Sequence, residues 1–73
     1  MEQTYQNMLN DLLLNQGILK IELAKLLKTS MKRINIVLAK NNPEEQFTLT
    51  QLQRLGVLYN RFKQYETLLN GYY

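Results

Sequence analysis

The sequence KIELAKLLKTSMKRINIVLAK, residues 20–40, decides the fold of this 73-residue chain. Its apolar residues follow helical spacing on both sides of a polar interruption at residues 28–30. The pattern predicts two short amphipathic helices, over residues 20–27 and 31–40, joined by a tight turn. Ser30 is a favoured N-cap residue, so we expect the second helix to begin directly after it.

Each of these two helices is expected to bury one face. A projection at the helical repeat places the inward residues at Leu23, Ala24, Leu27, Ile34, Val37 and Leu38. The small Ala24 suits a close crossing of two helices. The same projection sends basic and amide side chains outward on the second helix, together with Ile36 and Ala39.

The positive charge of the chain is concentrated in the same stretch. Residues 20–40 carry six basic residues against one acidic residue, whereas the remainder carries three basic against five acidic residues. A local net charge of +5 suits contact with a polyanion. We therefore expect residues 20–40 to form the binding surface.

The composition excludes several classes of function. The chain contains no cysteine and no histidine, which rules out disulfides, thiolate or imidazole metal sites and Ser-His or Cys nucleophiles. The adjacent Glu44 and Glu45 lack a converging third group, so we interpret them as solvated. We expect no enzyme activity, no catalytic residue, no metal, no cofactor and no small-molecule ligand. Apolar runs such as residues 12–14 are too short to span a bilayer, and we expect a cytoplasmic protein.

The remaining segments predict an all-α fold, a compact single domain of four to five helices over residues 1–73. The apolar spacing of residues 5–15 indicates a first helix, with Thr4 as its N-cap and Gly17 as its stop. After residue 40, Asn41-Asn42-Pro43 ends the central unit and opens a polar loop.

An amphipathic C-terminal helix is predicted over about residues 49–69, beginning at a capping box formed by Thr48 and Gln51. Gly56 lies inside it, so either two helices pack closely there or one helix ends and another begins. An a/d-like seam fits a homodimer interface, and equally fits core packing. The seam residues are Leu55, Leu58, Phe62, Tyr65, Leu69 and Tyr72.

The pattern Leu23-Ala24-x-x-Leu27-x-x-Ser30-x-x-x-Ile34-x-x-Val37 resembles the helix-turn-helix of the Cro and lambda-repressor-like (XRE-type) superfamily. The resemblance implies a DNA-binding transcriptional regulator, commonly a dimeric autorepressor of a phage or mobile-element operon. The order of the helices is also similar to small autoregulators associated with anti-CRISPR genes. Lys28 stands where the family usually has the turn glycine, so we expect a lysine in a left-handed conformation.

The resemblance implies that the second helix of the unit enters the major groove of double-stranded DNA. Lysine can donate to guanine, asparagine can pair with adenine, and apolar side chains can contact thymine methyl groups. The residues expected to read bases are Met31, Lys32, Asn35, Ile36 and Ala39. The residues expected to bind phosphates are Lys20, Lys28, Ser30, Arg33 and Lys40, with Lys25 in reserve. A homodimer would bind a palindromic operator.

Two other classes of function remain open. The chain could use a helix-turn-helix scaffold as a protein-protein adaptor or antirepressor. Binding to an anionic membrane surface is disfavoured, because the basic residues do not oppose one continuous apolar face.

Overall fold

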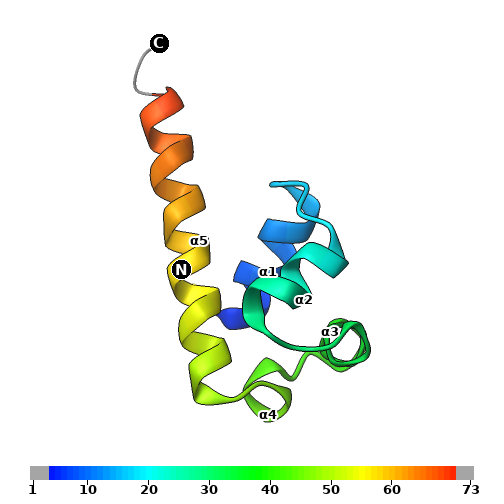
Figure 1. The fold of residues 1–73 in the computed structure, drawn as a ribbon. Coiled ribbons are helices and arrows are strands. Elements are labelled where there is room, and N and C mark those ends of the chain that lie inside the picture. Colours follow the sequence, from blue (N-terminus) through cyan, green and yellow to red (C-terminus); the bar gives the residue numbers. More distant parts are fainter. Residues whose placement is uncertain (1–3, 71–73) are drawn as a thin grey trace.

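The computed structural model describes residues 4–70, apart from the side chains of residues 67, 69 and 70. Within this range the chain forms five helices and no strand (Figure 1). The helices are α1 (Tyr5–Leu14), α2 (Lys20–Leu27), α3 (Met31–Lys40), α4 (Pro43–Gln46) and α5 (Leu49–Asn70). The all-α fold is confirmed, and α2 and α3 begin and end at the predicted residues. None of these helices combines the length and the apolar character that crossing a membrane requires.

The first helix begins and ends as its sequence predicts. The Thr4 hydroxyl oxygen accepts a hydrogen bond from the backbone N–H of Asn7 at 3.1 Å. Beyond the other end, Gly17 adopts a φ of +73°, a region that costs a residue without Cβ little. The backbone N–H of Ile18 then donates to the carbonyl of Leu12 at 3.1 Å, which folds the chain back over the helix end.

Side-chain caps also fix the start of α3 and α5. The Ser30 hydroxyl accepts a hydrogen bond from the backbone N–H of Arg33 at 3.1 Å. At α5, Thr48 and Gln51 cap each other reciprocally, at 2.9 and 3.2 Å. These bonds satisfy backbone donors that have no partner within a helix, so each helix begins at a defined residue.

The turn between α2 and α3 contains a lysine in the left-handed conformation, as predicted, with Lys28 at φ 57°. The backbone N–H of Thr29 donates to the carbonyl of Ala24 at 2.9 Å, closing the end of α2. From α5, the Gln51 amide donates to the Lys28 carbonyl at 2.9 Å. Backbone and side-chain hydrogen bonds therefore hold the turn between α2 and α3 without a glycine. Asn41, after α3, has the same left-handed conformation with φ 58°.

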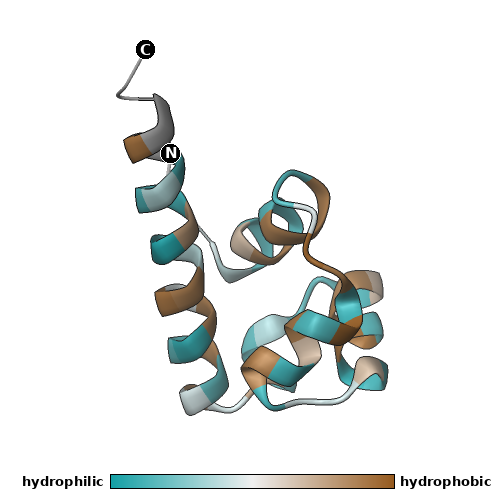
Figure 2. Cartoon of the chain, turned by 45° about the horizontal axis from the view of Figure 1, so that its top comes forward, coloured by the Kyte–Doolittle hydropathy of each residue, from teal (hydrophilic) through white to brown (hydrophobic). Residues whose placement is uncertain are grey.

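The core lies among α1, α2, α3 and α5, and α4 packs against α1, α3 and α5. Five of the six predicted inward residues of α2 and α3 are buried, and Leu38 packs against them partly buried. Figure 2 shows hydrophilic and hydrophobic segments alternating along α5, as an amphipathic helix requires. The buried residues are Leu9, Leu12, Leu23, Ala24, Leu27, Ile34, Val37, Phe47, Leu52, Leu55 and Tyr59.

The structure corrects the predicted polar loop at α4 and settles the open question of whether α5 is continuous. The segment predicted as a polar loop contains the one-turn helix α4, because Pro43 occupies its first turn and is buried. The fifth helix runs unbroken through Gly56, and a Cβ built there would meet no atom within 4 Å. Gly56 therefore marks neither a break nor a close helix crossing. The C-terminal turns of α5 extend past the other helices (Figure 1).

The predicted seam on α5 is corrected at its first residue. Leu55 is fully buried in the core of its own chain, which leaves it no surface for a second copy. Leu58 and Phe62 are partly buried against the core, whereas Tyr65 is 64% exposed. The side chain of Leu69 and all of Tyr72 lie outside the described residues. The apolar stripe of α5 is thus buried at Leu55 and exposed at Tyr65.

Candidate nucleic-acid interface

The outer face of α3 presents a polar surface opposite its buried Ile34 and Val37. Lys32, Asn35 and Ala39 are exposed on this face. Of the other two predicted base-reading residues, Met31 is 38% exposed and Ile36 is half-buried. The structure therefore brings all five to the surface of one helix, with Ile36 the least accessible. The major groove of B-DNA is wide enough to admit an α-helix.

Lys20 contacts this face from the neighbouring helix. It is the first residue of α2, and its ammonium Nζ lies 3.2 Å from the amide Oδ1 of Asn35. Both side chains are exposed. The two residues are fifteen positions apart in the sequence, so helical spacing cannot predict this pair.

Arg33 has a structural contact that its sequence position does not reveal. Its guanidinium Nη1 donates to the backbone carbonyl of Gln46 at 2.7 Å, which links α3 to the end of α4. The side chain is nevertheless exposed, and a guanidinium carries five N–H donors. The remaining donors form no hydrogen bond to the residues that the structure describes, so Arg33 can hold the fold and still offer N–H groups to an anion.

The other predicted phosphate ligands lie at the ends of the two helices. Lys28 follows α2, Ser30 precedes α3 and Lys40 is the last residue of α3, and all three are exposed. The Ser30 oxygen accepts the capping bond from Arg33, which leaves its O–H as a donor. No basic side chain of residues 20–40 forms an ion pair within the described part of the chain. This surface therefore carries uncompensated positive charge.

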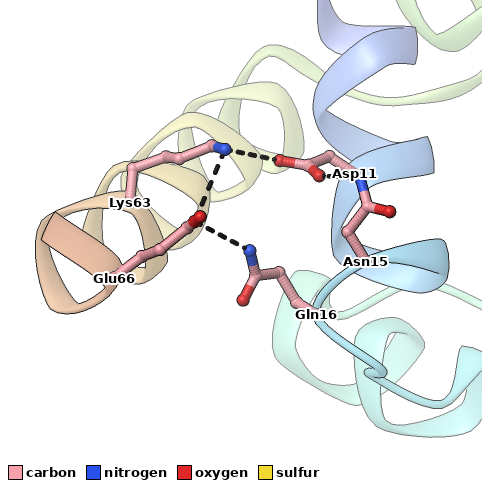
Figure 3. Close-up of polar contacts among 5 residues, drawn as sticks. All are labelled: Asp11, Asn15, Gln16, Lys63 and Glu66. Carbon is pink, nitrogen blue, oxygen red and sulfur yellow. Dashed lines mark hydrogen bonds and ion pairs between the residues drawn. The ribbon is translucent and has the colours of Figure 1, made fainter. Parts of the chain in front are cut away.

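The contact between α1 and α5 has the opposite character (Figure 3). The Lys63 ammonium lies 3.1 Å from the Asp11 carboxylate and 3.5 Å from the Glu66 carboxylate. Gln16 donates to Glu66 at 3.2 Å, and the Asn15 amide donates to Asp11. One ammonium of α5 thus pairs with a carboxylate of α1 and with a carboxylate of its own helix.

These charges shift one another in the directions expected of a paired site. The hydrogen bond from Asn15 and the nearby Lys63 lower the pKa of Asp11, against an opposing effect of burial. The same Asp11 carboxylate raises the pKa of Lys63. Burial, with Asp11 alongside, raises the pKa of Tyr59. We interpret the cluster as a polar link between α1 and α5, since Lys63 of α5 pairs with Asp11 of α1.

A shallow groove of about 490 Å³ lies between α2 and α5. Its apolar residues include Leu26 and Val57, which are 51% and 53% exposed. Its basic residues are Lys28, Arg54 and Arg61, and no acidic residue lines it. The sequence did not reveal this groove, because its two sides come from helices that are distant in the chain. In the described residues, no group of three acidic side chains could hold a metal ion.

Comparisons with protein-family models, curated proteins and solved structures give no match for this chain. Any functional interpretation therefore depends on the residues and contacts described above.

Proposed function

We propose that this protein is a sequence-specific double-stranded DNA-binding regulator, acting as a dimeric repressor of a phage or mobile-element operon that includes its own gene. The observation that carries the proposal is the uncompensated positive charge of the α2–α3 surface. Six basic side chains lie on one helix-turn-helix unit, and none forms an ion pair with the described residues. Unpaired positive charges on one surface attract a polyanion, whose negative charges then compensate them.

In this proposal α3 enters the major groove, with its N-terminal half nearest the base edges, and α2 lies across the backbone. Lys32 and Asn35 donate to base edges, and Met31, Ile36 and Ala39 contact apolar groups such as thymine methyls. Phosphates bind at Lys28, Ser30, Arg33 and Lys40, which lie at the helix ends around the reading face. The buried face of α3 keeps the helix fixed on the domain while its outer face is inserted.

The dimer contact in this proposal uses the part of α5 that the core leaves uncovered. Val57, Tyr65 and Leu68 are 53%, 64% and 63% exposed, and Phe62 is only partly buried. A second copy packed there would bury apolar surface that a small domain cannot cover alone. Two-fold symmetry would place two α3 helices in successive major grooves, about 34 Å apart.

Selection of bound sites from a random duplex pool tests the proposal. We expect an enriched palindrome with half-sites about one helical turn apart, bound by two copies of the chain. Sedimentation of the complex gives the copy number. A pool that shows no enrichment after repeated rounds contradicts sequence-specific binding. An enriched site without two-fold symmetry contradicts the homodimer alone.

The groove between α2 and α5 favours a second candidate function, a protein-protein adaptor or antirepressor. Its exposed Leu26 and Val57, bordered by Arg54 and Arg61, suit an amphipathic segment with acidic residues. An adaptor would bind such a segment and leave duplex DNA unbound even at low salt. The same DNA-binding measurement therefore separates the two candidates.

A further inference from the structure

The contact between Lys20 and Asn35 fixes the direction in which the Asn35 amide points. The Lys20 ammonium can only donate hydrogen bonds, and its Nζ lies 3.2 Å from Oδ1 of Asn35. The amide oxygen therefore faces Lys20, and the amide NH₂ group is left to donate to another partner. Without this contact, an exposed asparagine could present either its donor or its acceptor to a base.

This orientation disfavours adenine as the base that Asn35 reads. Bidentate pairing with adenine needs the amide oxygen to accept from the N6 amino group while the NH₂ group donates to N7. In this protein a positive ammonium already occupies the vicinity of that oxygen. An adenine amino group brought to the second lone pair of this oxygen would place its partially positive hydrogens beside the ammonium, which is unfavourable in a site from which water is excluded.

Guanine matches the groups that the pair offers. Its major-groove edge presents two neighbouring acceptors, O6 and N7, and no donor. The Lys20 ammonium, through its remaining N–H groups, and the Asn35 NH₂ group are donors on two side chains that one hydrogen bond joins. Lys32, one turn from Asn35 on the same exposed face, adds a third donor.

We infer that Lys20 and Asn35 act as one two-donor unit that reads guanine, with Lys20 orienting the Asn35 amide. The inference depends on the proposed DNA binding and specifies the base that is read. It changes two expectations from the sequence, in which Lys20 bound a phosphate and Asn35 paired with adenine. Lys20 of α2 thereby helps α3 to select the base.

The test uses the full chain and the duplex site that the parent protein selects. Lys20→Met removes the ammonium and keeps an unbranched side chain of similar reach. Its matched control is Lys25→Met, which removes an exposed lysine from the same helix that forms no hydrogen bond with the described residues of α3. We expect the parent to prefer guanine over adenine by about tenfold or more at one position of each half-site. Lys20→Met should reduce this preference to within about threefold, or reverse it.

Four further results test the inference. Asn35→Ala should lose discrimination at the same base pair as Lys20→Met, and Lys25→Met should lower affinity for every base equally. Replacing that guanine by 7-deazaguanine should weaken the parent several-fold and Lys20→Met less, because N7 is one of the two acceptors. Circular dichroism should give the same melting temperature for parent and Lys20→Met, since both side chains in the pair are exposed.

The inference and the proposed function fail differently. If the parent selects a site but prefers adenine at the Asn35 position, the inference is wrong and DNA binding stands. If Lys20→Met weakens all sites uniformly, Lys20 is a phosphate ligand and the inference is again wrong. If the parent binds no duplex, both fail together.

Discussion

The α1–α5 contact and the α2–α3 surface use charge in opposite ways. Between α1 and α5, Lys63 lies within 3.1 and 3.5 Å of two carboxylates, and its positive charge is compensated inside the protein. On α2 and α3, six basic side chains form no ion pair with the described residues. The first region uses charge to join helices, and the second leaves charge available to a partner.

The contrast between the two regions shows why net charge alone says little about function in this chain. A total of +3 is modest, but it is the sum of +5 over residues 20–40 and −2 over the rest of the chain. Paired surface charges contribute little free energy and mainly restrain geometry. Unpaired charges on one face produce a local potential that attracts a polyanion. The two regions should therefore respond differently to substitution.

The largest effect on stability is expected in the core beneath α5. Leu55→Ala removes a fully buried side chain and leaves a cavity, so the free energy of unfolding should fall by about 2–5 kcal/mol. Leu49→Ala is the matched control, because Leu49 belongs to the same helix and is 71% exposed. The control should change stability by less than about 0.5 kcal/mol. Urea unfolding at one protein concentration measures both, and equal losses would contradict the assignment of Leu55 to the core.

The next largest effect is expected on discrimination between DNA sites, without a loss of stability. Lys32→Ala with Asn35→Ala should lower discrimination between the selected site and other duplexes by about 1–3 kcal/mol for each base that is no longer read. Both residues are exposed, so the melting temperature should stay within about 2 °C of the parent. Competition binding with selected and scrambled duplexes measures the discrimination. A variant that discriminates as well as the parent would show that other residues read the sequence.

A smaller effect is expected at the turn that joins the two helices of the basic surface. Lys28→Gly should raise the free energy of unfolding by about 0.5–1 kcal/mol, because glycine adopts φ 57° without Cβ strain. Asn41→Gly is the control at φ 58°, where asparagine already tolerates the conformation, and its gain should be smaller. Thermal and urea unfolding measure both variants. Destabilisation by Lys28→Gly would mean that the lysine side chain contributes to folding.

The smallest effect tests the paired region through its pH dependence. The pKa of Asp11 is lowered in the folded state, so its stabilisation is present above about pH 3.8 and is lost as the pH falls through the lowered pKa. Asp11→Asn should therefore lower the melting temperature by a few degrees at pH 7, and the difference should shrink as the pH falls below about 3.8 and through the lowered pKa. Glu44→Gln removes an exposed carboxylate and should show no such difference. A constant difference from pH 7 to pH 3 would exclude a charge effect.

Helix positions and ends could be predicted from the sequence because their causes are local. The bounds of α2 and α3 follow from apolar periodicity and from Ser30, and the caps of α1 and α5 follow from Thr4 and Thr48. The left-handed Lys28 is expected only from the resemblance, in which its position is usually a glycine. Periodicity over eight or more residues is enough to define such elements.

The features that the sequence left open depend on contacts between distant residues or on elements too short to show a period. One turn of helix, α4, has no measurable repeat. Buried and exposed residues share one apolar stripe on α5, so periodicity could not show that Leu55 is buried and Tyr65 exposed. The bond from Lys20 to Asn35 and the bond from Arg33 to Gln46 join different helices, and only the packed structure brings them together.

The central claim is that the uncompensated charge of α2 and α3 binds the phosphates of duplex DNA. Fluorescence anisotropy of a labelled duplex over a series of salt concentrations tests it most directly. With Lys28, Arg33 and Lys40 on phosphates, log Kobs should fall against log salt with a slope of about −3 for each protein chain bound. Absence of binding at about 50 mM salt, or binding that does not depend on salt, would contradict the claim.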